Sequence, residues 1–292
     1  IDPGAVEIAK LRLWLSLVVD EEDIKQIKPL PNLDYKIVCG NSLIGVEKNL
    51  FNDVLFKELE RIKPLLFNET SPKKKQEYKN QIDDLISQIT NGHQEFDFEV
   101  YFSEVFHEKK GFDVVIGNPP YLNFKSYPSE DREAYKQLYR EVFNGKADVY
   151  YYFIFKGMAL ANPNGFLSFI TSRYWIEAEF AAKLRQYISE NYEIREILDF
   201  SNAVIFEQGI KVAITSIAKR RISDHTLRFM SYVGKKFVGL QNDKLEISLV
   251  RDSTLLSSDN RWIFVESSGS DLLAKISKNS VPLDDIAFCK QG

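Results

Sequence analysis

The chain of 292 residues carries a formal net charge of −4 and is 44% hydrophobic, a composition that allows one large domain or two. No uninterrupted apolar run approaches the ~18 residues that a helix needs to cross a bilayer, so we expect a soluble protein without a membrane segment. Its two cysteines offer no disulfide framework, which favours a cytoplasmic location, and its three scattered histidines lack metal-ligand spacing, so no metal site is expected.

The first predicted elements are a helix and a strand. Residues 4–19 repeat apolar side chains at helical spacing, and Pro3 suits the first turn of such a helix. Residues 35–39 predict the next strand, and Asn41 follows it directly.

Residues 46–110 predict a helical insertion. Two apolar faces have the spacing of helices, and a polar stretch, Ser71-Pro72-Lys73-Lys74-Lys75, separates them. The first face consists of Phe51, Val54, Leu55, Leu59 and Ile62, and the second of Tyr78, Ile82, Leu85 and Ile89. The pair therefore predicts a helical hairpin.

The most informative stretch follows at 112–121. The run Phe112-Asp113-Val114-Val115-Ile116-Gly117 is typical of a fully buried parallel strand, and it leads straight into Asn118-Pro119-Pro120-Tyr121. Ligands of α/β sheets bind outside the carboxyl ends of such strands. Since Asn-Pro also opens ordinary turns, the alternative is a turn that merely ends the strand.

The chemistry of this tetrapeptide suits methylation of an amino nitrogen. An amino group on a ring is a poor nucleophile, and it needs acceptors for its hydrogens and for the positive charge that it gains. The Asn118 side-chain oxygen and the Pro119 carbonyl can accept. Pro119 and Pro120 fix the backbone in advance, and Tyr121 offers a ring that can stack on a planar group.

The remaining elements alternate between strands and helices. Helices are predicted near 130–142, at 148–161, where Asn162-Pro163-Asn164-Gly165 ends the helix, and at 176–190; strands are predicted at 166–171, 194–200 and 212–219. This alternation predicts a doubly wound α/β sheet with helices on both faces. Beyond 222 the sequence changes character, with short strands at 227–233 and 245–250 and a short helix near 270–277.

Four segments together resemble a known family. They are Ile1 to Leu15, Lys36 to Leu43, Phe96 to Phe102 and Asn118-Pro119-Pro120-Tyr121. In order and content they are similar to gamma-type DNA adenine-N6 methyltransferases of restriction-modification systems, in particular the bifunctional type IIG-like enzymes. The resemblance covers nearly the whole chain. The tetrapeptide alone is less specific, because protein-glutamine and some ribosomal-RNA guanine methyltransferases also carry it.

The resemblance implies a Rossmann-like sheet, S-adenosylmethionine as cofactor, and double-stranded DNA with a flipped adenine as partner. Asn118, Pro119, Pro120 and Tyr121 match the catalytic motif. Phe206 matches the aromatic that stacks on the flipped base opposite Tyr121, although a phenylalanine there could equally be a core residue of the hairpin. Asn41 and Asp2 match cofactor-side positions; Asn41 could instead be a cap or turn residue.

The resemblance also implies boundaries. The family's glycine-rich cofactor loop and the strands around it would precede Ile1, so we expect an internal fragment that alone binds S-adenosylmethionine weakly and is inactive. Residues 1–222 correspond to the catalytic core, with an antiparallel edge hairpin across 201–211. Residues 223–292 correspond to a linker and the start of the target-recognition domain. Loss of the rest of that domain would explain the acidic charge of a DNA enzyme.

Two other functions remain open from the sequence. The first is a protein-glutamine methyltransferase, whose substrate amide nitrogen is an equally poor nucleophile and would need the same four residues. A non-catalytic DNA-binding or assembly module would agree with the lack of a cofactor loop. The helical insertion and the extension after residue 222 favour the DNA methyltransferase over the first of these.

Overall fold

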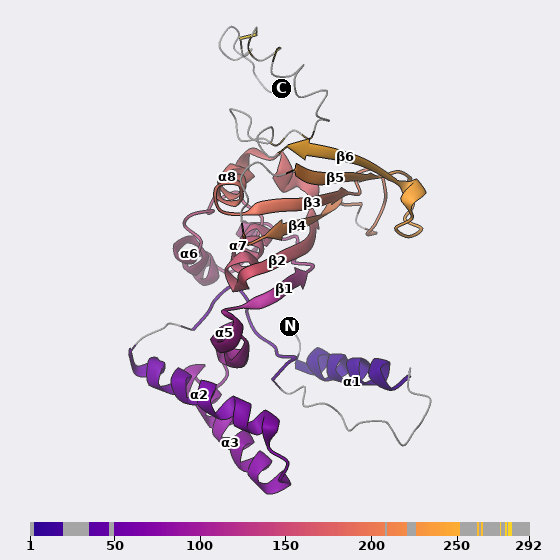
Figure 1. The fold of residues 1–292 in the computed structure, drawn as a ribbon. Coiled ribbons are helices and arrows are strands. Elements are labelled where there is room, and N and C mark those ends of the chain that lie inside the picture. Colours follow the sequence, from indigo (N-terminus) through magenta and orange to yellow (C-terminus); the bar gives the residue numbers. More distant parts are fainter. Residues whose placement is uncertain are drawn as a thin grey trace. The chain divides into compact units, whose positions relative to one another are not determined.

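The computed structural model describes residues 3–19, 35–46, 50–207, 209–220 and 226–251, together with single residues near the C-terminus (Figure 1). The chain divides into two compact units, Ile1–Phe112 and Asp113–Gly292. Among the described residues, no helix combines the length and apolar character needed to cross a membrane.

The first unit opens with α1 (Pro3–Val19), which confirms the helix predicted at 4–19. A proline at the start suits a helix because the first turn needs no donor at that position. The apolar side chains of α1 are not gathered into a core: Ile8, Leu11, Leu13 and Val19 are all exposed.

The predicted helical hairpin is confirmed. It consists of α2 (Leu50–Asn68) and α3 (Pro72–Ile89). Its buried core includes the side chains of Tyr35, Val46, Leu59, Ile62, Leu66, Ile82, Ile86, Ile89 and Val100. The polar break is shorter than predicted, because Pro72 takes the first position of α3 and the three lysines after it already belong to the helix.

The strand predicted at 35–39 is wrong. Residues 35–46 form turns and bends that pack on the hairpin, with Tyr35 buried and its hydroxyl donating to Asp83 Oδ1 at 2.6 Å. A strand requires a neighbour that pairs with its backbone, and no described strand lies beside this segment. The segment packs instead on residues 96–97: a Cβ at Gly40 would lie 2.2 Å from the Phe96 side chain, and one at Gly45 would lie 2.6 Å from Asp97 Oδ2.

A buried lysine joins the hairpin to the two short helices that follow, α4 (Phe98–Tyr101) and α5 (Ser103–Lys109). Lys63 is 1% exposed, and its ammonium donates to the carbonyls of Val100 and Tyr101 and lies 3.4 Å from Glu104 Oε2. Burial lowers the pKa of Lys63 to about 8, against the opposing effect of Glu104.

This lysine should give the first unit a pH-dependent stability. Between pH 8 and 10.5 the unfolded chain keeps a proton on Lys63 that the folded chain releases, so the free energy of unfolding should rise with pH in that window. Between these limits, the free energy of unfolding of the wild type should rise by up to about 3 kcal/mol more than that of Lys63→Met. Urea denaturation followed by circular dichroism at several pH values measures this difference. Lys57→Met, on the exposed face of α2, is the control. The hydrogen bond to Asp53 raises the pKa of Lys57 above its usual value, so its removal should not change the pH dependence between pH 8 and 10.5; the same result for Lys63→Met would contradict the prediction.

The second unit is built on a six-stranded sheet in the order β1-β2-β4-β3-β5-β6 (Figure 1). The strands are β1 (Phe112–Gly117), β2 (Ala161–Ser172), β3 (Glu193–Asp199), β4 (Val212–Ala218), β5 (Thr226–Tyr232) and β6 (Leu245–Arg251). β4 runs antiparallel to both β2 and β3, β5 runs parallel to β3, and β6 runs antiparallel to β5. The mixed α/β fold class predicted from the sequence is confirmed.

Three details of the predicted sheet are wrong. β1 is an edge strand in the described sheet, and Val114 and Ile116 on one of its faces are 47% and 81% exposed. The hairpin of β3 and β4 is antiparallel as predicted but not at an edge, because β4 lies between β2 and β3. The strands predicted at 227–233 and 245–250 are confirmed as β5 and β6, but they join the same sheet, so the strand predicted at 212–219 is not its last. The helix predicted near 270–277 falls largely outside the described residues.

Within the described part of the second unit, three α-helices accompany the sheet: α6 (Ser129–Leu138), α7 (Tyr150–Leu160) and α8 (Ala182–Asn191). Gly157 lets α7 approach the sheet, since a Cβ there would lie 2.5 Å from Leu167 Cδ1. α8 starts later than the helix predicted at 176–190. The buried Arg185 explains this, because its guanidinium donates to the carbonyls of Trp175 and Ala178, which a continuous helix would use for its own hydrogen bonds.

Candidate functional site

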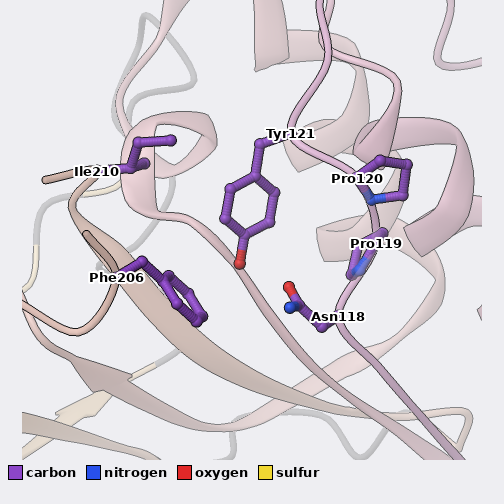
Figure 2. Close-up of a pocket in the computed structure, with 6 residues that line it drawn as sticks. All are labelled: Asn118, Pro119, Pro120, Tyr121, Phe206 and Ile210. Atoms are coloured by element: carbon purple, nitrogen blue, oxygen red, sulfur yellow. The ribbon is translucent and has the colours of Figure 1, made fainter. Parts of the chain in front are cut away.

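The Asn118-Pro119-Pro120-Tyr121 turn leaves the carboxyl end of β1 and lines a pocket of about 270 Å³ (Figure 2). Phe206 and Ile210, from the connection between β3 and β4, complete its lining. The structure therefore brings together the motif and the distant aromatic that the sequence singled out. Figure 2 shows the Asn118 amide and the hydroxyl end of Tyr121 pointing toward one another, with the Phe206 ring facing them from the other side.

In this turn the backbone is fixed, while the side-chain amide of Asn118 is accessible. Pro119 is buried, whereas the Asn118 side chain is exposed. Within the described part of the chain, the Asn118 amide forms no hydrogen bond, so its oxygen is free to accept one from a ligand. Proline at the next two positions restricts Asn118 and fixes the backbone dihedral φ after it, and this holds the acceptors in place before a ligand arrives.

Tyr121 is held from two sides. Its hydroxyl donates to the carbonyl of Ile170 in β2 at 3.1 Å, and its ring meets that of Tyr150 edge-on, with centroids 6.0 Å apart. Burial raises the pKa of Tyr121 to about 12, so the phenol stays neutral near pH 7. A neutral ring of fixed orientation is suited to stacking on a planar ligand.

The connection that carries Phe206 is anchored at its base. Asp199, at the end of β3, accepts from Arg173 Nε at 2.8 Å and from the Ser201 backbone N–H at 2.8 Å. The Phe200 N–H then donates to the Val212 carbonyl at 3.0 Å, which closes the loop onto the start of β4. These contacts fix both ends of the segment between Asp199 and Val212 and leave Phe206 near its tip.

The two aromatic rings of the pocket are not parallel. The centroids of Tyr121 and Phe206 lie 6.4 Å apart and their planes meet at 63°. A planar group can stack on either ring as they stand. Stacking on both at once requires the Phe206 ring to turn toward the plane of Tyr121.

The start of α7 supports the motif in a way that the sequence did not reveal. The Val149 N–H donates to the Leu122 carbonyl at 2.9 Å, and Asn123 forms an isolated antiparallel bridge with Asp148. The next residue, Tyr150, is fully buried against Tyr121. In the sequence, this support is signalled only by the three tyrosines at 150–152, and such a cluster is typical of an ordinary hydrophobic core.

The two cofactor-side residues expected from the sequence have different outcomes. Asn41 lies in the first unit, where its Oδ1 accepts the Leu43 N–H at 3.0 Å; this is the turn geometry that the sequence allowed as an alternative. Its side chain is exposed and its orientation is fixed by that bond, so a contact with a ligand remains compatible with the turn. Asp2 lies outside the described residues.

Comparison with known proteins places this site in a family. The model of the Eco57I restriction-modification methylase family matches residues 1–206, from the start of the chain to the pocket phenylalanine. The chain belongs to the Eco57I restriction-modification methylase family. The match covers Asn41, the helical hairpin, the Asn-Pro-Pro-Tyr turn and Phe206, so the segments quoted from the sequence all lie within it.

Individual members of related systems share part of the chain. The type II methyltransferase M.BstVI of Geobacillus stearothermophilus is 29% identical over 197 residues, covering 61% of this chain and 35% of that protein. The type II restriction enzyme and methyltransferase RM.Eco57I of Escherichia coli is 26% identical over 180 residues, covering 60% of this chain and 17% of that protein. The chain thus spans little more than a third of the length of these relatives at most.

Among solved structures, the type IIG restriction endonuclease BpuSI matches 80% of this chain and 34% of its own, with 13% identity and a TM-score of 0.43. A putative class I S-adenosylmethionine-dependent methyltransferase from Listeria monocytogenes matches 39% of this chain and 33% of its own, with 25% identity and a TM-score of 0.32.

Proposed function

We propose that this chain is the part of a DNA adenine-N6 methyltransferase that holds the target base, within a type IIG-like restriction-modification protein. One observation carries the proposal: a single pocket combines the Asn118 amide and the Pro119 turn with the rings of Tyr121 and Phe206. Hydrogen-bond acceptors for an amino group and aromatic faces for a planar base are thereby offered at one place.

The acceptors answer the chemical difficulty of the reaction. The lone pair of the adenine amino nitrogen is delocalised into the ring, so the nitrogen attacks poorly. Accepting its two hydrogens at Asn118 Oδ1 and the Pro119 carbonyl favours a more tetrahedral nitrogen and stabilises its developing positive charge. No general base is needed before the attack, since the amino group is already neutral.

The size and the walls of the pocket suit one extruded base. About 270 Å³ lies just below the range of roughly 300–1,000 Å³ that is usual for drug-sized ligands. Extruding a base from a duplex costs a few kcal/mol of stacking and pairing. Stacking on Tyr121, and on Phe206 once its ring turns, offsets part of that cost.

S-adenosylmethionine is the proposed methyl donor, and when bound it supplies a methyl group activated by the sulfonium. Asn41 is the described residue that we propose to contact its adenine ring, because its amide is exposed and held in one orientation. Asp2 is proposed on the family resemblance alone. We further propose that the whole protein acts in the cytoplasm, where its DNA substrate lies.

The full-length protein should transfer labelled methyl groups to DNA. The test incubates it with methyl-labelled S-adenosylmethionine and either duplex DNA or a protein extract, and then identifies the labelled nucleoside or amino acid. We expect N6-methyladenine in the DNA and no label in protein. Label at glutamine would support the protein methyltransferase instead, and label only at cytosine would contradict the adenine assignment.

A further inference from the structure

A second surface lies beside the pocket, on the connection between β5 and β6. Residues 233–240, Val-Gly-Lys-Lys-Phe-Val-Gly-Leu, form what we call the lysine loop. In Figure 1 the β5–β6 connection lies at the end of the sheet toward which the β1 arrow points, the end at which the Asn-Pro-Pro-Tyr turn begins.

The lysine loop is bonded to the segment that carries Phe206. The Val204 N–H donates to the Lys235 carbonyl at 3.1 Å, and Val204 forms a parallel bridge with Lys236. Val204 precedes Phe206 by two residues, which is a spacing of about 6–7 Å in an extended chain. The backbone of both lysines therefore lies close to one wall of the pocket.

The loop has a defined shape of its own. The Tyr232 hydroxyl donates to the Lys236 carbonyl at 3.3 Å and accepts from the Val238 N–H at 3.1 Å. Gly234 and Gly239 have φ values of +144° and +115°, which side chains rarely tolerate. Phe237 packs on Tyr232 with ring centroids 5.6 Å apart. The two lysines between these anchors are therefore presented at a fixed place.

The charge of this surface runs against that of the chain. Lys235 and Lys236 are exposed, and neither ammonium has a hydrogen bond or an ion pair within the described ranges. The lysine loop contains no acidic residue. Lys211, which follows the pocket residue Ile210, is also exposed. Across the 200–211 segment, Glu207 is the single acidic residue. In a chain of net charge −4, Lys211, Lys235 and Lys236 form a local excess of positive charge on segments next to the pocket.

We propose that Lys235 and Lys236 bind the DNA phosphates next to the extruded adenine. This inference rests on the proposed function. Phosphates recur about every 3.4 Å of axis along a strand, so more than one lies near a base held in the pocket. Lysine ammoniums without acidic partners neutralise such phosphates and release counterions, which stabilises the complex without reading the sequence. The loop then positions the strand while Tyr121 and Phe206 hold the base.

The test compares the salt dependence of DNA binding by the full-length wild type and Lys235→Gln/Lys236→Gln. Binding of a fluorescent duplex is followed by anisotropy over a range of salt concentrations. We expect weaker binding for every sequence tested, and a slope of log K against log salt that is smaller by about two, close to one for each phosphate that a lysine no longer neutralises. The value of kcat at saturating DNA should stay within roughly twofold, since neither lysine reaches the reacting atoms.

The matched control is Lys136→Gln/Lys183→Gln, which removes the same charge from α6 and α8. Both helices lie away from the β5–β6 connection in Figure 1. An unchanged salt slope for the lysine-loop variant, or a change equal to that of the control, would overturn the inference while methylation by the wild type left the proposed function standing. The same measurement with an RNA duplex gives a further check: weaker binding of the lysine-loop variant to RNA but not to DNA would overturn the inference as well. A wild type that neither binds nor methylates DNA would overturn both.

Discussion

Asn118→Ala in the full-length protein is expected to lower kcat for adenine methylation by about 100-fold or more, with little change in DNA affinity. The Asn118 oxygen accepts an amino hydrogen most strongly as the nitrogen becomes positive, so its loss should affect the transition state more than binding. Removing one preorganised hydrogen-bonding group of this kind costs roughly 100- to 1,000-fold in kcat. Single-turnover methylation at saturating DNA and cofactor measures the effect.

The Asn118→Ala variant should fold as the wild type does. Asn118 is exposed and forms no hydrogen bond in the described part of the chain, so its truncation should change the free energy of unfolding by no more than about 0.5 kcal/mol. Asn202→Ala is the matched control, because Asn202 is an exposed asparagine in the connection that carries Phe206 and does not line the pocket. Asn118→Asp keeps acceptor oxygens and should retain more activity than Asn118→Ala. Equal activity of Asn118→Ala and wild type would refute the assigned role.

Most of the secondary structure followed from local patterns, because those patterns report local physics. Helical spacing predicted α1 and the hairpin of α2 and α3, and the Asn-Pro-Asn-Gly stretch predicted the end of α7. What the patterns do not contain is pairing. The segment at 35–39 has a strand-like composition but no described partner, and the apolar face of β1 that carries Val114 and Ile116 is exposed.

The same distinction between local pattern and long-range pairing applies to the residues of the site. The turn at 118–121 was predictable because its chemistry is contiguous in sequence. Phe206 came from the family resemblance, and the structure places it in the same pocket. The supports of these residues were not predictable: Arg173 reaches Asp199 across 26 positions, and Tyr121 reaches Ile170 across 49. Such contacts exist only once the strands have paired.

The second large effect is expected at Phe206. Phe206→Ala should weaken binding of DNA with an extruded adenine by about 10-fold, since stacking of one base on an aromatic side chain contributes roughly 1–3 kcal/mol. Phe206→Trp keeps an aromatic face and should bind nearly as well as the wild type. The fluorescence of 2-aminopurine at the target position, which rises when the base leaves the stack, measures the extruded population directly.

The control removes an exposed phenylalanine that is remote from the pocket. Phe166 is 42% exposed and pairs with Ala218, at the end of the β2–β4 pairing far from the Ser172–Val212 pair, so Phe166→Ala should leave extrusion unchanged.

A mispaired target base distinguishes stacking from a purely structural role of Phe206. A mismatch lowers the cost of extrusion, so less stacking energy is needed to hold the base in the pocket. The extruded population, read from 2-aminopurine fluorescence, should therefore differ less between Phe206→Ala and the wild type on a duplex with a mismatch at the target adenine. A difference in extruded population of the same size on matched and mismatched duplexes would mean that Phe206 only packs in the loop. In the structure its ring meets Tyr121 at 63°, so the stacking role also requires the ring to turn when the base arrives.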